Sequence, residues 1–334
     1  NNDGADAVSG TFSGRPQGAL ITLNGSEFQL SYLGGTGNDV VLTCIFSPRA
    51  WNGSASNLWS NPNNWTPAGI PITGDGLLFP AGASNLANIN DLAIGTSLSR
   101  IVFTGSNYAL SGNSITLTSM LRSESGVGAN VVSLPIDVST NAVTFASLSF
   151  SNNSLQVTGP VSGTGPLTLA GGPSCYGHVS ISGTHSYAGT ITASPLSCLK
   201  AMLNGASLPS ANYVFSANQM GGNGTLGAFS WPNAGDLVIG GNNVVQTTDT
   251  TTGVLNTGSF SASNSGGLYM NVNGTSPGAS YDQINVTGTV TLGSSKTLNL
   301  TLGSSFVPSL GQQFVLINND GADAVSGTFS GRPQ

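Results

Sequence analysis

The chain has 334 residues, a formal net charge of −6 and charged side chains at only 6% of its positions, against roughly 25% in an ordinary globular domain. This scarcity leaves few groups for binding nucleic acid and few paired carboxylates for glycoside hydrolysis, so we expect neither a nucleic-acid partner nor an enzyme. The apolar runs are far shorter than the roughly 20 residues of a membrane-spanning helix, so we expect no membrane span.

The first seventeen residues, NNDGADAVSGTFSGRPQ, recur without one change at 318–334. Diverged internal repeats do not stay identical, so the simplest interpretation is one period of a tandem array plus a short overlap. The period would then be 317 residues, which is the 334 residues less the duplicated 17. A second interpretation is a separate chain that donates a strand to its neighbour, and a third is an expression artefact.

Both of the first two interpretations predict a one-dimensional assembly of copies, so the partner that we expect is the protein itself. The duplicated segments and the strands beside them would form the junction. The candidate junction residues are Asn1, Asp3, Asp6, Phe12, Phe314, Asn318, Asp320, Asp323 and Phe329.

Residues 1–43 have the pattern of a β unit that begins elsewhere. Their alternation of apolar and polar residues continues that of 271–334, and Asn24-Gly25 between two alternating runs is a strong hairpin signal. We therefore expect a small β-sandwich-like unit that starts in 271–334 and is completed across the repeat boundary by 1–43. Residues 44–50 would be a linker, in which Pro48 interrupts any strand.

Three of the four tryptophans, Trp51, Trp59 and Trp65, lie close together at the start of the next segment. Their rings could form a sugar-stacking platform, or they could form a hydrophobic plug over the open end of a stack of strands. The plug is the favoured interpretation.

The main body is predicted to span 51–270. Short runs of Val, Ile, Leu, Thr and Phe alternate there with Gly, Asn and Ser turns. Turns recur about every 8 to 12 residues, which suits either a β-sandwich or a parallel β-helix. The sequence therefore predicts an all-β protein.

The stretch GHVSISGTHSYAGTITA at 177–193 resembles the autotransporter-associated β-strand repeat. Ser182-Gly183 and the run Tyr187-Ala188-Gly189-Thr190 carry the match, whereas His185-Ser186 replaces the Asn-Thr that the family favours. The tryptophan segment resembles the entry to such repeats, and SYLGGTGNDVVLT resembles their closing segment. The resemblance implies an elongated, right-handed β-solenoid in a secreted or cell-surface bacterial protein without a catalytic role.

Two segments offer oxygen ligands for Ca²⁺, the only cofactor that we consider. Residues 34–42 fit the calcium-binding nonapeptide G-G-x-G-x-D-x-U-x through Asp39, and Asp3 and Asp6 lie in an Asn-rich loop. Such a site shares each ion with a following repeat, and only one copy is present. A Gly-rich turn and side-chain caps are therefore the favoured interpretation.

Cys175 and Cys198 are separated by 23 positions, about one coil of a β-solenoid. They could stack on adjacent rungs and form a disulfide, or remain two buried thiols. The sequence leaves both alternatives open.

These observations lead to a structural hypothesis. We expect one period of an extracellular or cell-surface fibre, assembled end to end by strand continuity or by strand exchange. The alternative function is an adhesin or carbohydrate-binding module, which would contact glycans or a surface through 51–65.

Overall fold

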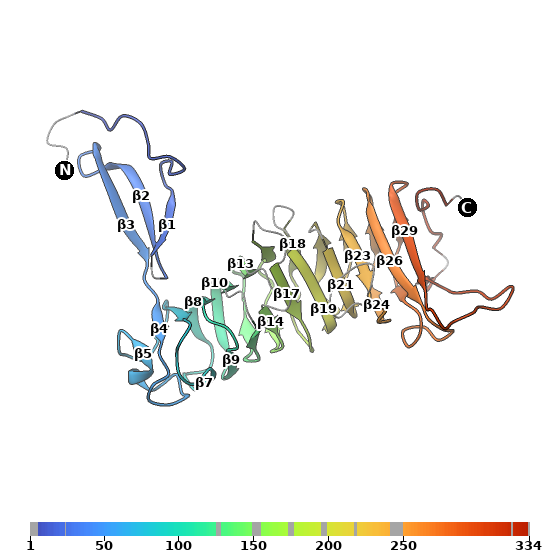
Figure 1. Cartoon of the computed structure of the whole chain (residues 1–334), viewed down its shortest axis with the longest axis horizontal. Helices are drawn as coiled ribbons and strands as arrows, with labels where there is room; N and C mark the ends of the chain where they lie inside the picture. The colour runs from blue at the N-terminus through green and yellow to red at the C-terminus, as the bar shows by residue number, and fades with distance from the viewer. Residues whose placement is uncertain are drawn as a thin grey trace.

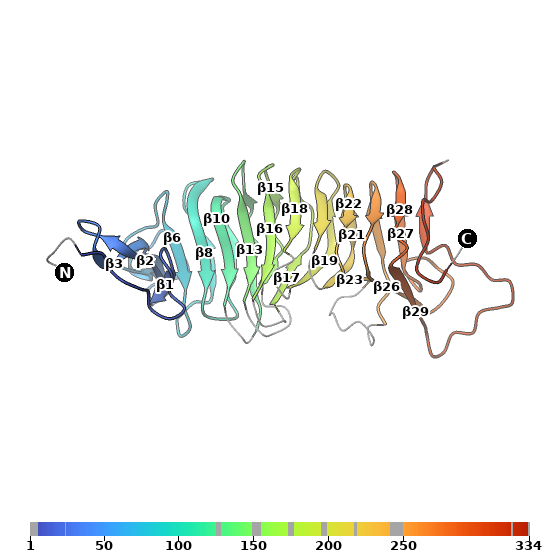
Figure 2. The same cartoon turned by 90° about the horizontal axis from the view of Figure 1, so that it is seen from above.

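The structure is a computed structural model that describes residues 6–23, 25–124, 128–148, 155–172, 177–194, 199–216, 219–240, 250–321 and 323–332. Within these ranges the regular structure is β-strand, apart from one 3₁₀ turn, η1 (Pro62–Asn64). Figures 1 and 2 show a long stack of strands with a small sheet standing at its N-terminal end. The expected all-β fold with a β-solenoid body is confirmed.

The small sheet has three antiparallel strands in the order β1-β2-β3. They are β1 (Leu20–Leu23), β2 (Ser26–Gly34) and β3 (Asp39–Phe46). Only Ser47 and Pro48 separate β3 from β4 (Arg49–Trp51), the first strand of the solenoid. The predicted linker of 44–50 is therefore reduced to these two residues, because the strands on either side of it extend into the rest of that range.

The solenoid has two long sheets, and apart from the antiparallel β4–β5 pair their strands are parallel within the described ranges. One sheet contains β4 (Arg49–Trp51), β5 (Trp65–Thr66), β6 (Gly76–Phe79), β8 (Thr96–Phe103), β10 (Ile115–Ser123), β12 (Ile136–Asp137), β13 (Val143–Ser147), β15 (Val161–Ser162), β16 (Leu167–Gly171), β18 (Thr190–Ala193), β20 (Asn212–Phe215), β22 (Phe229–Trp231), β25 (Phe260–Ala262) and β28 (Val290–Leu292).

The other sheet contains β7 (Ala87–Asn90), β9 (Ala109–Gly112), β11 (Asn130–Val132), β14 (Leu155–Val157), β17 (Gly177–Ile181), β19 (Leu199–Leu208), β21 (Gln219–Leu226), β23 (Asp236–Ile239), β24 (Val254–Thr257), β26 (Gly266–Val272), β27 (Gln283–Val286), β29 (Lys296–Leu302) and β30 (Ile317–Asn319). The chain visits the two sheets in turn, so each strand pairs with strands from the turns before and after it.

Inward side chains stack in columns along the solenoid axis. Because the strands pair in register, apolar residues of successive turns lie directly over one another and exclude water from the space between the sheets. One such column is Val143, Leu167, Ile191, Tyr213, Phe229, Phe260 and Val290, all buried.

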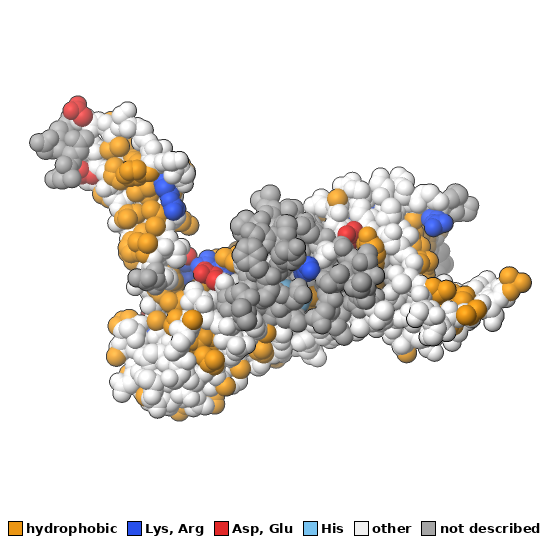
Figure 3. Space-filling view, viewed as in Figure 1, with side chains coloured by type: hydrophobic (Ala, Val, Ile, Leu, Met, Phe, Trp, Pro, Cys, Tyr) orange, Lys and Arg blue, Asp and Glu red, His pale blue; other side chains and the backbone are white. Residues whose placement is uncertain are grey.

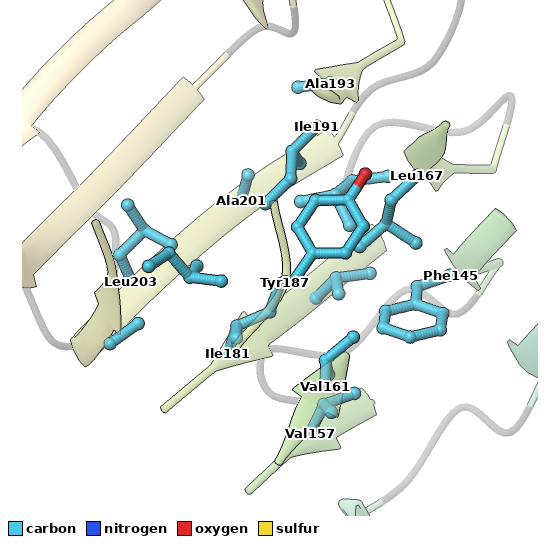
Figure 4. Close-up of a cluster of buried hydrophobic side chains, with 14 of the residues drawn as sticks. Phe145, Val157, Val161, Leu167, Ile181, Tyr187, Ile191, Ala193, Ala201 and Leu203 are labelled. Atoms are coloured by element: carbon cyan, nitrogen blue, oxygen red, sulfur yellow. The ribbon is translucent and has the colours of Figure 1, made fainter. Parts of the chain in front are cut away.

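The segment that resembles the autotransporter-associated repeat supplies part of this core. Tyr187 lies between the two sheets, packed near Ile191 and Phe145 in Figure 4. Its hydroxyl lies 2.8 Å from the carbonyl oxygen of Gly165 and 2.9 Å from that of Thr190. A tyrosine is tolerated in this apolar space because its hydroxyl reaches two backbone carbonyl groups at the edge of the core.

The solenoid does not end at residue 270, where the sequence pattern placed its boundary. Strands β27, β28, β29 and β30 extend both sheets in parallel register. Residues 271–319 therefore belong to the body in this chain, and the small sheet consists of β1, β2 and β3. A parallel rung and an antiparallel strand have the same period-two alternation, so the pattern alone could not distinguish them.

Charged side chains join the small sheet to the first turns of the body. Glu27 on β2 accepts from Arg100 at 2.6 Å and lies 3.7 Å from Arg122, which in turn pairs with Glu124 at 2.6 Å. The Arg100 guanidinium also lies 4.0 Å from the centre of the Phe46 ring on β3. Both glutamates of the chain are therefore used in one cluster, where they fix the base of the sheet against β8 and β10.

We expect acid to destabilise the solenoid through His178, a buried residue of β17. Burial, with a smaller effect of the nearby Lys200 charge, lowers the pKa of His178 to about 4. Unfolding restores a pKa near 6.5, so the unfolded chain binds the proton first as the pH falls. The free energy of unfolding should therefore decrease by up to about 3 kcal/mol between pH 6.5 and pH 4.

Urea denaturation at a series of pH values measures this effect. The His178→Gln variant should lose this part of the pH dependence while keeping the contribution of His185, whose pKa is also lowered by burial. Equal slopes for the two proteins below pH 6.5 would contradict the prediction.

Candidate functional site

The N-terminal end of the solenoid is closed by aromatic rings. Trp51, Trp59 and Trp65 are all at least 98% buried, and their rings meet edge to face at centroid distances of 5.0 Å (Trp51–Trp65) and 6.0 Å (Trp59–Trp65). Phe79 of the next turn packs beneath all three. The rings have no exposed face for a sugar, so their arrangement is that of an end plug.

Hydrogen bonds hold this plug in place. The indole N–H of Trp59 donates to Asn88 at 2.7 Å, and that of Trp65 donates to the carbonyl of Trp59 at 2.8 Å. Asn64, fully buried, accepts from the backbone amides of Ala55 and Ser56 at 2.9 Å. The polar residues of this segment thus satisfy the loop backbone around the rings, which explains why tryptophan and asparagine alternate so densely there.

At the opposite end of the solenoid, the last turn within the described ranges is uncovered. On β29, Leu300 and Leu302 stand in register with the buried Met270 and Val272 of β26, yet each is 53% exposed. These leucines occupy core positions, and the next turn that would cover them is not provided by the described residues. The last turn therefore exposes apolar surface that every earlier turn buries.

A long connection between β29 and β30 lies at the same end and reaches away from the body in Figure 1. It presents Val307, 87% exposed, and the fully exposed Leu310. Phe314, a predicted junction residue, packs edge to face against Tyr281 at 5.5 Å and Phe306 at 6.0 Å. This aromatic group fixes the root of the connection to the body.

The second copy of the duplicated segment lies on the last turns of the solenoid. Its first two residues complete β30, which begins at Ile317. In this strand Asn318 pairs with Asn285 of β27, and its side chain donates to the Asn285 side chain at 3.2 Å. Further along, the backbone amide of Ser326 donates to the carbonyl of Val290 at 3.0 Å, and the carbonyl of Ser326 accepts from the amide of Leu292 at 2.7 Å. These bonds place Ser326 beside β28 as a parallel strand of another turn would be placed.

Three other predicted junction residues of this copy contact the solenoid or stabilise the segment itself. The amide of Asp320 donates to the carbonyl of Val286 at 3.1 Å, and the backbone carbonyl of Asp323 accepts from Asn319 at 2.6 Å. Both aspartate residues are exposed. Phe329 is half-buried and packs against the core.

The first copy of the same segment lies on the small sheet. The amide of Phe12 donates to the Tyr32 hydroxyl at 2.8 Å, and this hydroxyl donates to the carbonyl of Arg15 at 2.6 Å. The Gln17 side chain accepts from the Tyr32 amide at 2.7 Å. The Phe12 ring lies 6.1 Å from the Tyr32 ring but stays 63% exposed. Asp6 is exposed.

One face of the small sheet is apolar. The register places Ile21, Phe28 and Cys44 side by side, with Leu30 and Leu42 paired next to them. Leu30 is buried, whereas Leu42 is 49% exposed and Cys44 is an exposed free thiol. Figure 3 shows hydrophobic side chains along the length of this sheet. The sheet thus has an apolar surface that its own chain only partly covers.

The remaining predicted sites fall into two groups. Asn1, Asp3, Cys175 and Cys198 lie outside the described residues. Asp39 lies within them, and its carboxylate fills the space where a side chain at Gly35 would stand, at the turn before β3. Across the described ranges no cluster of three or more His, Cys, Asp or Glu side chains has a metal-binding arrangement, and no helix is long and apolar enough to cross a membrane.

Sequence reasoning did not identify Tyr32, Leu300 or Leu302. Tyr32 is an ordinary member of an alternating strand, and its role depends on a partner seventeen or more residues away. Leu300 and Leu302 have the pattern of core residues, and only the position of the last turn exposes them. No local signal in the sequence reports either property.

Removing a ring from the plug should destabilise the whole body. We expect Trp59→Ala to lower the free energy of unfolding by about 3–5 kcal/mol, because it opens a large cavity at a buried site. The neighbouring Leu58 is 37% exposed, so Leu58→Ala serves as the control and should cost much less. Denaturant titration measures both, and equal stability of Trp59→Ala and the parent protein would rule out the plug.

No protein family, curated protein or solved structure matches this chain.

Proposed function

We propose that the chain is one structural period of an extracellular fibre in which successive copies join end to end. The observation that carries this proposal is the open last turn, where Leu300 and Leu302 are each 53% exposed at core positions. A solenoid that leaves such a turn uncovered exposes both apolar side chains and an unpaired strand edge, and proteins normally cover these.

The two ends of the chain differ in a way that suits head-to-tail joining. The N-terminal end has a closed plug and, beyond it, a sheet with an apolar face. The C-terminal end has an open core. Different surfaces that fit one another generate an open, one-dimensional array rather than a closed dimer.

The surface chemistry also favours close approach of many copies. The net charge of −6 is spread over 334 residues, and most surface positions carry Ser, Thr, Asn or Gly. Copies with so little charge repel one another weakly, so long arrays meet little electrostatic resistance. The two forms of joining, a continuous chain of many periods or separate chains with exchanged strands, both use the same surfaces.

A carbohydrate-binding role through 51–65 is not retained, because Trp51, Trp59 and Trp65 are buried. Extracellular location and the likeness to autotransporter-associated repeats remain part of the proposal. The pattern of short parallel rungs with Ser- and Thr-rich surfaces supports them.

The mass of the denatured, reduced polypeptide from its native source tests the form of joining. We expect a mass several times the 33.5 kDa of this chain, with limited proteolysis giving a ladder in steps of one period. Electron microscopy of the native material should show fibres. A mass near 33.5 kDa together with fibres would indicate exchanged strands, and single particles without fibres would refute the proposal.

A charge at the open end should prevent the joint from forming. We expect Leu300→Asp, introduced at the native locus, to abolish or shorten the fibres, because an unpaired carboxylate would be buried between copies. Ile94 is 80% exposed on a turn of the body, so Ile94→Asp is the matched control and should leave fibres of normal length. Normal fibres in the Leu300→Asp strain would contradict the role of this surface.

A further inference from the structure

We infer that the two identical copies of the duplicated segment show the two halves of a single joint. In the joint, one segment would contact the last turns of one solenoid and the β1–β3 sheet of the next copy at the same time. This inference rests on the proposed end-to-end assembly and names the surfaces that form it.

The first observation is that both copies have the same local backbone. The amide of Arg15 donates to the carbonyl of Phe12 at 2.9 Å, and the equivalent bond from Arg332 to Phe329 is 3.0 Å. The glycine before this turn has a φ of 82° in both copies, at Gly10 and Gly327. The segment therefore has one preferred shape, although its surroundings differ completely in the two places.

The glycine inside the turn agrees as well, with φ values of 69° at Gly14 and 67° at Gly331. Positive φ of this kind is readily adopted only by glycine, so the sequence itself fixes the turn. A segment with a fixed shape can present two different sides to two different partners.

The second observation is that the two copies use different atoms for their contacts. On the solenoid, the second copy uses the backbone of Ser326 and the amide of Ser330, which donates to the carbonyl of Lys296 at 2.7 Å. These residues correspond to Ser9 and Ser13 of the first copy. Among the described residues, neither of these serines forms a hydrogen bond to the sheet, so the solenoid contacts leave the sheet contacts available.

On the sheet, the first copy uses the amide of Phe12, the carbonyl of Arg15 and the side chain of Gln17. In the second copy, the amide of Phe329, which corresponds to Phe12, donates to none of the described residues. A Tyr32 hydroxyl from the next copy could therefore bind there without breaking any bond to the solenoid. The two sets of contacts are compatible in one segment.

The aromatic ring of the segment supports the same arrangement. Phe329 packs against the solenoid core, whereas Phe12 packs on Tyr32 with 63% of its surface exposed. In a single segment the ring would lie between the core on one side and Tyr32 on the other. Each copy alone shows the ring with only one of its two neighbours.

This joint also identifies what covers the open end. The small sheet begins at Leu20, directly after the segment. When the segment lies on the last turns, the sheet of the next copy is brought against β29, where its apolar face can cover Leu300 and Leu302. The occupant of the open end is therefore the β1–β3 sheet of the next copy.

A consequence distinguishes this inference from a general tendency to aggregate. In the 334-residue chain each half of the joint already holds its own copy of the segment. When two such chains meet, residues 318–334 of one chain and residues 1–17 of the next would have to occupy the same position in the joint. One of the two segments must therefore be displaced before the chains can join. The duplication should therefore weaken end-to-end association of this chain, and removal of one copy should strengthen it.

Four versions of the chain test this consequence: the intact chain, one without 1–17, one without 318–334, and one without either segment. Sedimentation velocity over a range of concentrations measures their association, and circular dichroism checks that each is folded. We expect each single deletion to associate at least about a hundredfold more tightly than the intact chain, because the hydrogen bonds between the removed segment and its own half of the joint no longer have to be broken. The double deletion should not associate.

A synthetic peptide with the sequence of 1–17 provides an independent readout in the doubly deleted chain. It should restore association at moderate concentration by bridging the two halves, and reverse it in excess by occupying every half separately. A peptide of the same composition in scrambled order is the control. Failure of the peptide to restore association, or equal association of all four versions, would overturn the inference.

A point variant tests the atoms named for the sheet side. In the chain without 1–17, the Tyr32 hydroxyl would bind the amide of Phe329 and the carbonyl of Arg332 in the neighbouring copy. Tyr32→Phe removes this hydroxyl, so association should weaken about tenfold. Tyr269→Phe, at a partly exposed position of β26, should have no effect, and an equal loss in both variants would argue against the Tyr32 contact.

The outcomes also separate this inference from the proposed function. If the native material forms fibres but no deletion changes association, the proposed fibre function would be retained and the proposed joint would be refuted. Association of the singly deleted chains without fibres in the native material would do the reverse.

Discussion

The constraint on which this structure depends is that a parallel β-strand satisfies its backbone only through the strands on either side of it. Each inner turn of the solenoid is stable because other turns lie above and below it, whereas the first and last of the described turns each have a neighbour on one side only. At the N-terminal end the chain supplies a substitute, in which three buried tryptophans and Asn64 close the core. At the C-terminal end it supplies only the short β30 and leaves Leu300 and Leu302 open.

Several of the few charged side chains lie where they fix the position of one part of the structure relative to another. Glu27, Arg100 and Arg122 fix the small sheet against the body. Near the other end, the buried Lys296 donates to the carbonyls of Asn233 and Ser265 and lies 3.4 Å from the centre of the Trp231 ring. Because burying an ion costs free energy unless it finds such partners, these few ions fix a geometry more than they add stability.

Much of the architecture followed from local patterns, whereas the last turns of the solenoid and the contacts of the duplicated segment did not. Alternating runs and glycine-rich turns predicted strands, and the dense tryptophans at 51–65 predicted a closed end. The alternation of KTLNLTL in β29 is equally suited to an antiparallel strand, so the body was expected to stop near residue 270 although it continues to β30. The exposure of Leu300 and the binding of the duplicated segment to Tyr32 depend on neighbours far away in the sequence, which no local period encodes.

The inclination of the small sheet has a geometric consequence for any array built from this chain. In Figure 1 the sheet stands at a marked angle to the solenoid axis, and the ion cluster around Glu27 keeps it there. Repeating one fixed rotation and translation at every joint generates a helix. The resulting fibre would be a polar, helically wound strand with a defined pitch, and its two tips would be chemically different surfaces.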